Sequence, residues 1–511
     1  MMLQPEKFSK LFPYFLFCII CSFVVAFRWL VLRDFSFKYP DSDQAIMWNS
    51  AIEFSKGHFY EPKFWGQSYN SMLEGLLAVP LIYLSIPVYK ALPVVTSFLA
   101  LFPFFLVSSI CLSKNLKTQA IIVICLPLFL PIEYDFLTSL SRGFVTGIFI
   151  SSFGWIAIFY KEKPWAYFCF GFFTLCGYLL NQNALLLTFP LFVFLFLNGL
   201  KQLSFYIYGG IGVVLGGLVL FLSNNFYVKN PSYSTMPVPS FKIRTELFEL
   251  LFQQPNKHLN FVSPLFWNSG VLVFLLLLLL IFLFIKQKKK VLAAVAFIFT
   301  LCIIASFGLE KIYNGTDSVY FSYARMFLAI PIGFVFFVPF LNITSKWVSS
   351  LFVIVSLAFF VAKVHLLPDT ISSNVDHKKE HTIAVDPIEY VNTVCQKLNY
   401  YSQKNKTELV VINSHGYYDF IDFGCAACID SFPKTLRPEF ERRTWRLVED
   451  KETIYANIIV VDEHQKLAHL LPLLSAKSIH YLNINGYYII SNNSLKTIDF
   501  LALLNIPVRK F

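Results

Sequence analysis

Two carboxylates stand close together near the start of the chain, in Pro40-Asp41-Ser42-Asp43. The apolar residues that follow recur at helical spacing, which predicts an amphipathic helix over Gln44–Lys56. Asp41 or Ser42 would be its N-cap, and Asp43 would lie in its first turn. Most aspartates in such positions only cap the helix. A carboxylate there is also placed to act as general base toward a hydroxyl or amine. Composition and spacing leave both interpretations open.

Two arginines are candidates for binding an anion. Arg325 lies at the outer end of a predicted membrane span, and Arg142 lies just before another. Arginines at the ends of spans commonly extend to the lipid headgroups, and this interpretation suits Arg142 better. A guanidinium also binds phosphate through two parallel hydrogen bonds. For Arg325 the two interpretations have equal weight.

Other polar residues of the outer loops give weaker signals. Glu74 is a candidate second carboxylate of a site or a buried partner of a Lys or Tyr. Glu133 and Asp135 would bind sugar hydroxyls or a cation, although exposed loop acids are usually only solvated. Asn181-Gln182-Asn183 is expected to satisfy a tight turn, with contact to a substrate as the alternative.

Metal ligands are not indicated by the cysteines and histidines. Cys425 and Cys428 are interpreted as two apolar thiols, with a tight disulfide as the alternative in an oxidising compartment. The histidines show no metal-ligand spacing. We therefore assign no metal site, and the carboxylate pair of the first outer loop is a candidate place for a divalent cation.

The elements that position these residues are predicted to be membrane helices. Of 511 residues 56% are hydrophobic and 14% are charged, and the mean hydropathy is +0.59. A soluble protein of this length needs more polar surface. The net charge is +11, but the lysines lie between the hydrophobic stretches. This placement indicates membrane lipids and not nucleic acid as partners. Leu11–Leu32 is too long for a signal-peptide core and is expected to be a retained first span.

The apolar stretches predict eleven transmembrane helices, each about as long as a helix that crosses the hydrocarbon core. They are 11–32, 91–112, 118–132, 143–160, 165–181, 184–198, 203–222, 269–285, 291–308, 325–341 and 347–363. With a cytoplasmic N-terminus, every inside segment carries lysine, as the positive-inside rule requires. Met72–Tyr89 is also apolar but contains Glu74, Pro80 and Pro87, so we expect a helix that lies on or dips into the outer face.

The chain divides into two parts by composition. Residues 1–363 are predicted to be a polytopic all-α transmembrane domain with long outer loops at 33–90 and 223–268. From about Pro368 charged and polar residues return, and 364–511 are predicted to be a small α/β domain outside the membrane. The expected strands and helices of that domain are Glu408–Asn413, Ile458–Asp462 and Gly486–Ser491, and Pro387–Tyr401 and His464–Leu474.

The first outer loop contains a series of motifs in fixed order. Asp41-Ser42-Asp43 is followed by the predicted helix, by Gly57-His58-Phe59-Tyr60 and by Phe64–Glu74. This order resembles the GT-C superfamily of membrane glycosyltransferases, which includes the protein O-mannosyltransferases and the lipid A aminoarabinose transferases. Their loop has an Asp-x or Asp-Glu site, an amphipathic helix and a Gly-x-x-Tyr stretch, and a bacterial branch adds Tyr-Gly-Gln-x-Tyr-x-x-x-Leu-Glu. Here Trp65 replaces the first Tyr of that stretch, and Met326–Pro331 loosely matches a further superfamily motif.

The resemblance implies a glycosyltransferase that moves a sugar from a polyprenyl-phosphate-linked donor to a lipid, glycan or protein acceptor on the outer face of the membrane. It implies a general base at Asp41 or Asp43, and we favour Asp43 because the helix pattern begins directly after it. It also implies that Arg325 binds the donor phosphate, with Arg142 as a second and weaker candidate. The substrate-binding residues that it implies are Tyr60, Gln67, Tyr69 and Glu74. Abundant Phe, Lys and Asn favour a bacterial inner membrane, with the C-terminal domain in the periplasm.

Two other functions are compatible with a membrane protein of this kind. A transporter or lipid flippase would have polar or broken helices at the midplane and often an inverted repeat. The predicted spans have almost no ionisable residue and no such repeat. A polymerase or ligase of lipid-linked glycans tends to carry its site in a later long loop, here 223–268, where Lys242, Arg244 and Glu246 form no recognisable motif.

Overall fold

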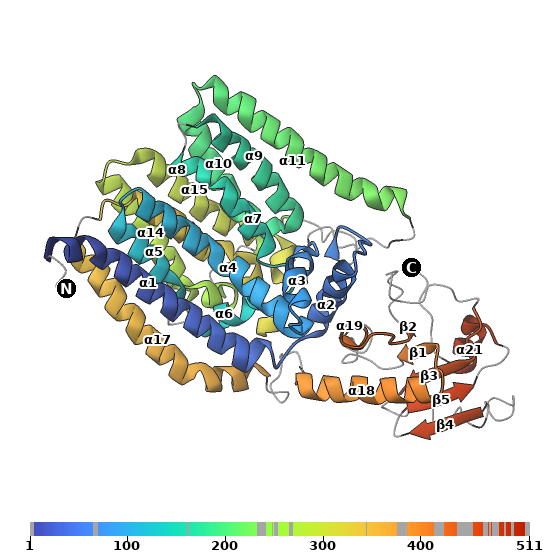
Figure 1. Ribbon diagram of the computed structural model, residues 1–511. Coiled ribbons are helices and arrows are strands. Elements are labelled where there is room, and N and C mark those ends of the chain that lie inside the picture. Colours follow the sequence, from blue (N-terminus) through green and yellow to red (C-terminus); the bar gives the residue numbers. More distant parts are fainter. Residues whose placement is uncertain are drawn as a thin grey trace.

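The chain folds into a large bundle of helices and a smaller α/β part, which lie side by side in Figure 1. The computed structural model describes residues 5–64, 70–160, 163–231, 233, 242–247, 249, 254–264, 269–343, 345–375, 385, 387–412, 424–436, 453–462, 469, 472, 480–484, 487–491 and 495–505. The last predicted helix, His464–Leu474, falls almost entirely outside these residues.

The bundle consists of α-helices that differ greatly in length. They are α1 Pro5–Val31, α2 Ser42–Ser55, α3 Leu73–Tyr83, α4 Val88–Ser113, α5 Lys117–Phe129, α6 Ile132–Leu137, α7 Thr146–Gly154, α8 Ile156–Phe159, α9 Pro164–Leu180, α10 Leu185–Gly199, α11 Leu203–Lys229, α13 Pro255–Leu259, α14 Gly270–Lys286, α15 Lys290–Ser306, α16 Ala329–Phe337 and α17 Lys346–Val375. Short 3₁₀ helices connect them, with one π-helical turn, η1 Leu32–Ser36, directly after α1. The 3₁₀ helices are η3 Gln182–Ala184, η4 Thr245–Leu247, η5 Asn260–Val262, η6 Glu310–Tyr313, η7 Val319–Phe321, η8 Tyr323–Phe327 and η9 Val338–Phe340.

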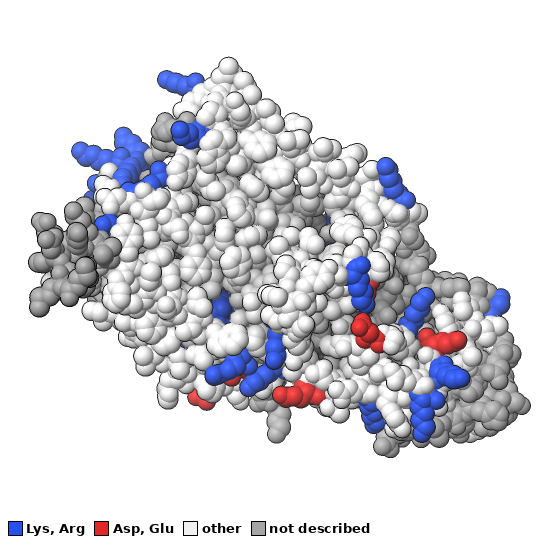
Figure 2. Space-filling view, in the orientation of Figure 1, with Lys and Arg blue, Asp and Glu red and all other residues white. Residues whose placement is uncertain are grey.

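Six helical stretches among the described residues are long and apolar enough to cross a membrane, so the chain is a multi-pass integral membrane protein. These six coincide with six of the predicted spans, and the other five predicted spans coincide with shorter apolar helices. The count of eleven and the cytoplasmic N-terminus stay predictions. Figure 2 shows few charged side chains over the bundle, with Lys and Arg gathered at its upper left end and both signs of charge near the α/β part.

The helix predicted after the first carboxylates is α2, but it is not a surface helix with one polar face. Gln44, Asn49 and Ser50 are all buried, together with the apolar residues between them, because α3 and α4 pack against α2. The amphipathic interpretation of this segment was therefore wrong. The next helix, α3, has 11 residues and is about 16 Å long, which is too short to cross a hydrocarbon core of about 30 Å.

The smaller part has a five-stranded sheet in the order β2-β1-β3-β5-β4. The strands are β1 Leu409–Ile412, β2 Lys434–Leu436, β3 Asn457–Val461, β4 His480–Ile484 and β5 Tyr487–Ser491, and the helices are α18 Ile388–Lys404, α19 Ala426–Cys428 and α21 Thr497–Leu503. β1 is parallel to both of its neighbours, whereas β5 is antiparallel to β3 and β4. The three strands and the first helix predicted for this part are confirmed.

The α/β part is attached to the bundle by packing as well as by the chain. The amide of Ile388 donates to the carbonyl of Lys38 at 2.8 Å, and α19 packs against α2. A disulfide joins Cys395 to Cys425 and leaves Cys428 as a free thiol, so the thiol interpretation of Cys425 was wrong. Pro368, where the composition changes, lies inside α17, which continues to Val375; the change in composition therefore does not mark the end of the last helix.

Candidate active site

The candidate site begins at the N-terminus of α2. Asp41 is the N-cap and accepts a hydrogen bond from the amide of Gln44 at 3.1 Å, as predicted. Asp43 lies in the first turn, where the free amides of a helix favour negative charge. The two carboxylates differ in exposure, because the Asp41 side chain is 5% exposed and the Asp43 side chain is 41% exposed. Only Asp43 is therefore open to a substrate.

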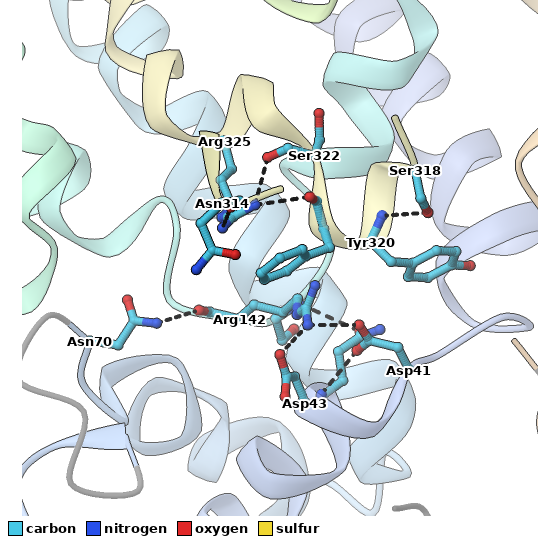
Figure 3. Close-up of polar contacts among 12 residues, drawn as sticks. Asp41, Asp43, Asn70, Arg142, Asn314, Ser318, Tyr320, Ser322 and Arg325 are labelled. Carbon is cyan, nitrogen blue, oxygen red and sulfur yellow. Dashed lines mark hydrogen bonds and ion pairs between the residues drawn. The ribbon is translucent and has the colours of Figure 1, made fainter. Parts of the chain in front are cut away.

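Arg142 joins the two carboxylates, although the sequence suggested a headgroup contact. Its Nη2 lies 3.2 Å from Asp41 Oδ2 and also forms an ion pair with Asp43 (Figure 3). The Arg142 side chain is 6% exposed, so the headgroup interpretation was wrong. The side chain amide of Asn70 donates to the Arg142 carbonyl at 3.2 Å, and the next residue, Gly143, turns the chain with a φ of +74°.

Burial and two neighbouring charges determine the pKa of Asp41. Burial raises the pKa of the Asp41 carboxyl to about 6, while the Arg142 guanidinium opposes the shift and the Asp43 carboxylate adds to it. The guanidinium therefore offsets part of the effect that burial has on the pKa of Asp41.

Arg325 and Lys311 supply positive charge on the opposite side of the site. Arg325 Nη1 donates to the carbonyls of Phe321 and Ser322, each at 2.9 Å, and its Nη2 donates to the carbonyl of Asn314. The backbone of η7 and η8 thus fixes the guanidinium, which also lies over the Phe321 ring. Burial and the nearby Arg325 charge lower the pKa of Lys311 to about 8. Lys311 was not among the predicted site residues, because nothing in its local sequence sets it apart.

A cavity of about 90 Å³ lies between these groups. Its charged lining residues are Asp43, Arg142, Lys311 and Arg325, so cations outnumber carboxylates. Its amide-bearing lining residues are Asn70, Asn181, Asn183 and Asn314. Such a lining suits a ligand with an anionic group and several hydroxyls, because guanidinium and ammonium groups pair with anions and amides bind hydroxyls.

Hydrogen bonds to neighbouring segments fix the asparagine side chains. Asn181 donates to Asn70 Oδ1 at 2.8 Å and to the Gly143 carbonyl at 3.0 Å. Asn183 donates to the Phe144 carbonyl at 2.9 Å. The turn interpretation of Asn181-Gln182-Asn183 is confirmed, and the same residues also border the cavity.

The remaining predicted residues lie around the site or outside the described chain. Glu74 is buried below the turn at Gly143, whose amide donates to Glu74 Oε2 at 3.1 Å. Burial raises the pKa of Glu74 to about 8. Its side chain supports the turn and is not among the residues that line the cavity. Tyr60 contacts Glu53 at 3.4 Å and is also not a lining residue. Gln67 and Tyr69 lie outside the described residues.

Neither the carboxylate pair nor the rest of the described chain offers a metal site. Among the residues that the structure describes, no three His, Cys, Asp or Glu side chains cluster as metal ligands. The Arg142 guanidinium occupies the position between Asp41 and Asp43 that a cation would need. The arrangement therefore does not fit the divalent cation considered from the sequence.

Comparison with known proteins bears on the fold. The sequence matches no family model and no curated protein. The structure resembles the crystal structure of ArnT from Cupriavidus metallidurans bound to undecaprenyl phosphate, with a TM-score of 0.55 and 11% sequence identity, over 93% of this chain and 98% of that chain. The chain therefore shares the overall fold of ArnT, in agreement with the fold expected from the resemblance of its first loop.

Proposed function

We propose that this protein is a glycosyltransferase that moves a sugar from a polyprenyl-phosphate-linked donor to an acceptor on the outer face of the membrane. The observation that carries the proposal is the cavity in which the partly exposed Asp43 lies with Arg142, Lys311 and Arg325. The fold shared with ArnT, which was solved with undecaprenyl phosphate, supports the same class of donor.

The cations would stabilise the leaving group. A polyprenyl phosphate gains negative charge as its bond to the sugar breaks, and cations that are already oriented stabilise such charge without reorganisation. Arg325 is oriented by three backbone carbonyls. Lys311 lies close enough to Arg325 for the two charges to repel each other, and a phosphate bound between them would relieve that repulsion.

Asp43 is the proposed general base. The acceptor oxygen or nitrogen attacks the anomeric carbon while the bond to the phosphate breaks, and the acceptor proton passes to Asp43. A single displacement of this kind inverts the anomeric centre. Arg142 pairs with a carboxylate oxygen of Asp43. A donor phosphate that attracts the Arg142 guanidinium would free this oxygen, so donor binding would prepare the base.

The proposal is tested with purified protein in lipid nanodiscs, labelled polyprenyl-phosphate sugars and a cell-envelope extract that supplies lipid, glycan and protein acceptors. We expect the label to move to an acceptor as free polyprenyl phosphate accumulates. Donor that stays intact but crosses the bilayer of proteoliposomes would instead support the transporter interpretation. Joining of whole lipid-linked glycans, with no transfer of single sugars, would support a polymerase or ligase.

A further inference from the structure

A buried charge cluster joins the first and last long helices of the bundle to α6. Asp135 of α6 lies 2.9 Å from Arg28 Nη2 of α1 and 2.6 Å from Lys363 Nζ of α17. All three side chains are at most 5% exposed. The sequence placed Asp135 in a solvated loop, and the structure shows that this was wrong. Two cations around one carboxylate are costly to bury, so the cluster calls for an explanation beyond stability.

The cluster is one end of a hydrogen-bonded segment that leads to the candidate site. We call residues 135–143 the strap. Arg28 Nη1 also donates to the Asp135 carbonyl at 2.8 Å and to Thr138 Oγ1 at 3.0 Å. The next hydroxyls pair with neighbouring segments, since Ser139 contacts Ser36 at 2.7 Å and Ser141 contacts Thr96 at 2.8 Å.

The other end of the strap carries Arg142. Its guanidinium meets Asp41 and Asp43, and the amide of Gly143 donates to Glu74. Thr138, Ser139 and Ser141 are completely buried. Side chains in a close-packed interior cannot shift independently, so a displacement at Asp135 would be passed along the strap to Arg142.

We propose that Arg28 and Lys363 are positioning residues of the transferase, which fix the strap and thereby hold Arg142 between Asp41 and Asp43. The expected effect on sugar transfer rests on the proposed function. The expected effect on the position of Arg142 does not. Misplacement of a catalytic constellation by about 1 Å costs up to about 100-fold in rate. The strap would prevent such misplacement from a distance.

Lys363 is the residue to change, because its loss leaves a balanced pair. In Lys363→Met, Arg28 and Asp135 still neutralise each other, whereas Asp135→Asn would leave two cations buried without a carboxylate. The matched control is Lys289→Met. Lys363 donates to the backbone carbonyl of Pro127 at 3.4 Å. Lys289 likewise donates to a backbone carbonyl, that of Phe340, and to Asn342 at 2.6 Å, but it does not contact the strap.

The first test reads the position of Arg142 without any transfer reaction. Phenylglyoxal modifies accessible guanidinium groups, and peptide mass spectrometry reports the modification of each arginine. We expect Arg142 to react about tenfold faster in Lys363→Met than in wild type, because the strap opens more readily. Lys289→Met should match wild type. Equal reactivity of Arg142 in Lys363→Met and wild type would overturn the inference.

A second variant keeps the inference falsifiable if Lys363→Met does not fold. Ser36→Ala removes one hydrogen bond to Ser139 in the middle of the strap and leaves every charge in place. We expect the same direction of change, an increase of about threefold in the reactivity of Arg142. No increase would contradict a role for the strap.

The pH profile of transfer separates positioning from general stability. The groups that face Asp41 and Asp43 are Arg142, Tyr320 and, across the cavity, Lys311 and Arg325. If Arg142 moves away, the carboxylate pair loses its nearest cation, and the acidic limb of the profile moves to higher pH. We expect this shift and a loss of about 10- to 100-fold in kcat for Lys363→Met, and neither for Lys289→Met.

Reduced activity with an unmoved acidic limb would show that Lys363 is only structural and would overturn the inference. If wild type transfers no sugar, the proposed function fails, and the reactivity of Arg142 still decides whether the strap positions it.

Discussion

Arg142 and Asp43 are 99 positions apart in the chain, and their side chains form an ion pair at the edge of the cavity. The same guanidinium nitrogen is 3.2 Å from Asp41. One cation therefore holds two carboxylates that stand at the start of α2. This ion pair places Arg142 in the candidate site and connects the start of α2 with the segment before α7.

Removal of the Arg142 charge should alter the pH dependence of transfer. Arg142 forms an ion pair with Asp43, the proposed general base, and a nearby cation favours the charged form of a carboxylate. In Arg142→Gln this cation is lost, so the acidic limb of the transfer profile should move to higher pH. Arg142→Lys should move it less, because a cation is kept although its planar fork is lost.

The control for that prediction is Arg33→Gln. Arg33 forms an ion pair with Asp34 at 2.6 Å, but its side chain is 57% exposed, and exposed pairs contribute little. A profile of Arg142→Gln that coincides with those of wild type and Arg33→Gln would be incompatible with the proposed pairing.

Donor affinity should depend on the charge of Lys311. The pKa of Lys311 is lowered to about 8 by burial and by Arg325, so the side chain loses its charge as the pH rises through about 8. The KM for the donor should therefore increase above that pH in wild type. Lys311→Arg should abolish the increase, because arginine keeps its proton. Lys311→Gln should have a high KM at every pH.

Lys257→Gln is the matched control for Lys311. Lys257 lies over the ring of Tyr323, which is two residues before Arg325, but it does not line the cavity. Its replacement should leave the KM unchanged. A wild-type KM that is constant from pH 7 to 9.5 would rule out the proposed role of Lys311.

Stability should fall with rising pH because of Glu74. Its pKa is raised from about 4.5 to about 8 by burial, so the folded chain holds a proton there that the unfolded chain releases. The free energy of unfolding therefore decreases as the pH rises from 4.5 to about 8, by at most about 1.4 kcal/mol per pH unit. Melting temperatures in detergent between pH 6.5 and 8 should decline for wild type and stay level for Glu74→Gln.

Glu389→Gln serves as the comparison for Glu74, since Glu389 is an exposed residue of α18. It should retain the wild-type decline. If the melting temperature of Glu74→Gln declines with pH as steeply as that of wild type, another group causes the pH dependence, and the prediction for Glu74 is wrong.

Local patterns were sufficient to predict the elements. Asp41 caps α2 as its type and position indicated, and β1, β3 and β5 lie within a residue or two of the predicted strands, because periodicity and capping are properties of neighbouring residues. The short strands β2 and β4 were missed. Cys425 pairs with Cys395 and not with nearby Cys428, although Cys395 is 30 positions away in the chain, because the fold brings these two residues together.

Long-range pairing was the part that the sequence could not reveal. Arg142 was assigned to the lipid headgroups and Asp135 to a solvated loop, since each lies beside an apolar stretch. Their partners come from distant segments, Asp41 and Asp43 for one and Arg28 and Lys363 for the other. Only tertiary packing brings these charges together, and residue spacing in the sequence does not predict such contacts.

The most direct test of the account is sugar transfer by purified Asp43→Asn protein beside wild type and Asp41→Asn. Asparagine is as good an N-cap as aspartate at position 41, and each variant keeps one carboxylate beside Arg142, so the melting temperature of each protein is measured to confirm that it folds. We predict that Asp43→Asn loses transfer from a polyprenyl-phosphate sugar by about 100- to 10,000-fold, while Asp41→Asn keeps much of it. Transfer by Asp43→Asn at the wild-type rate, or no use of the lipid-linked donor by wild type, would contradict the account.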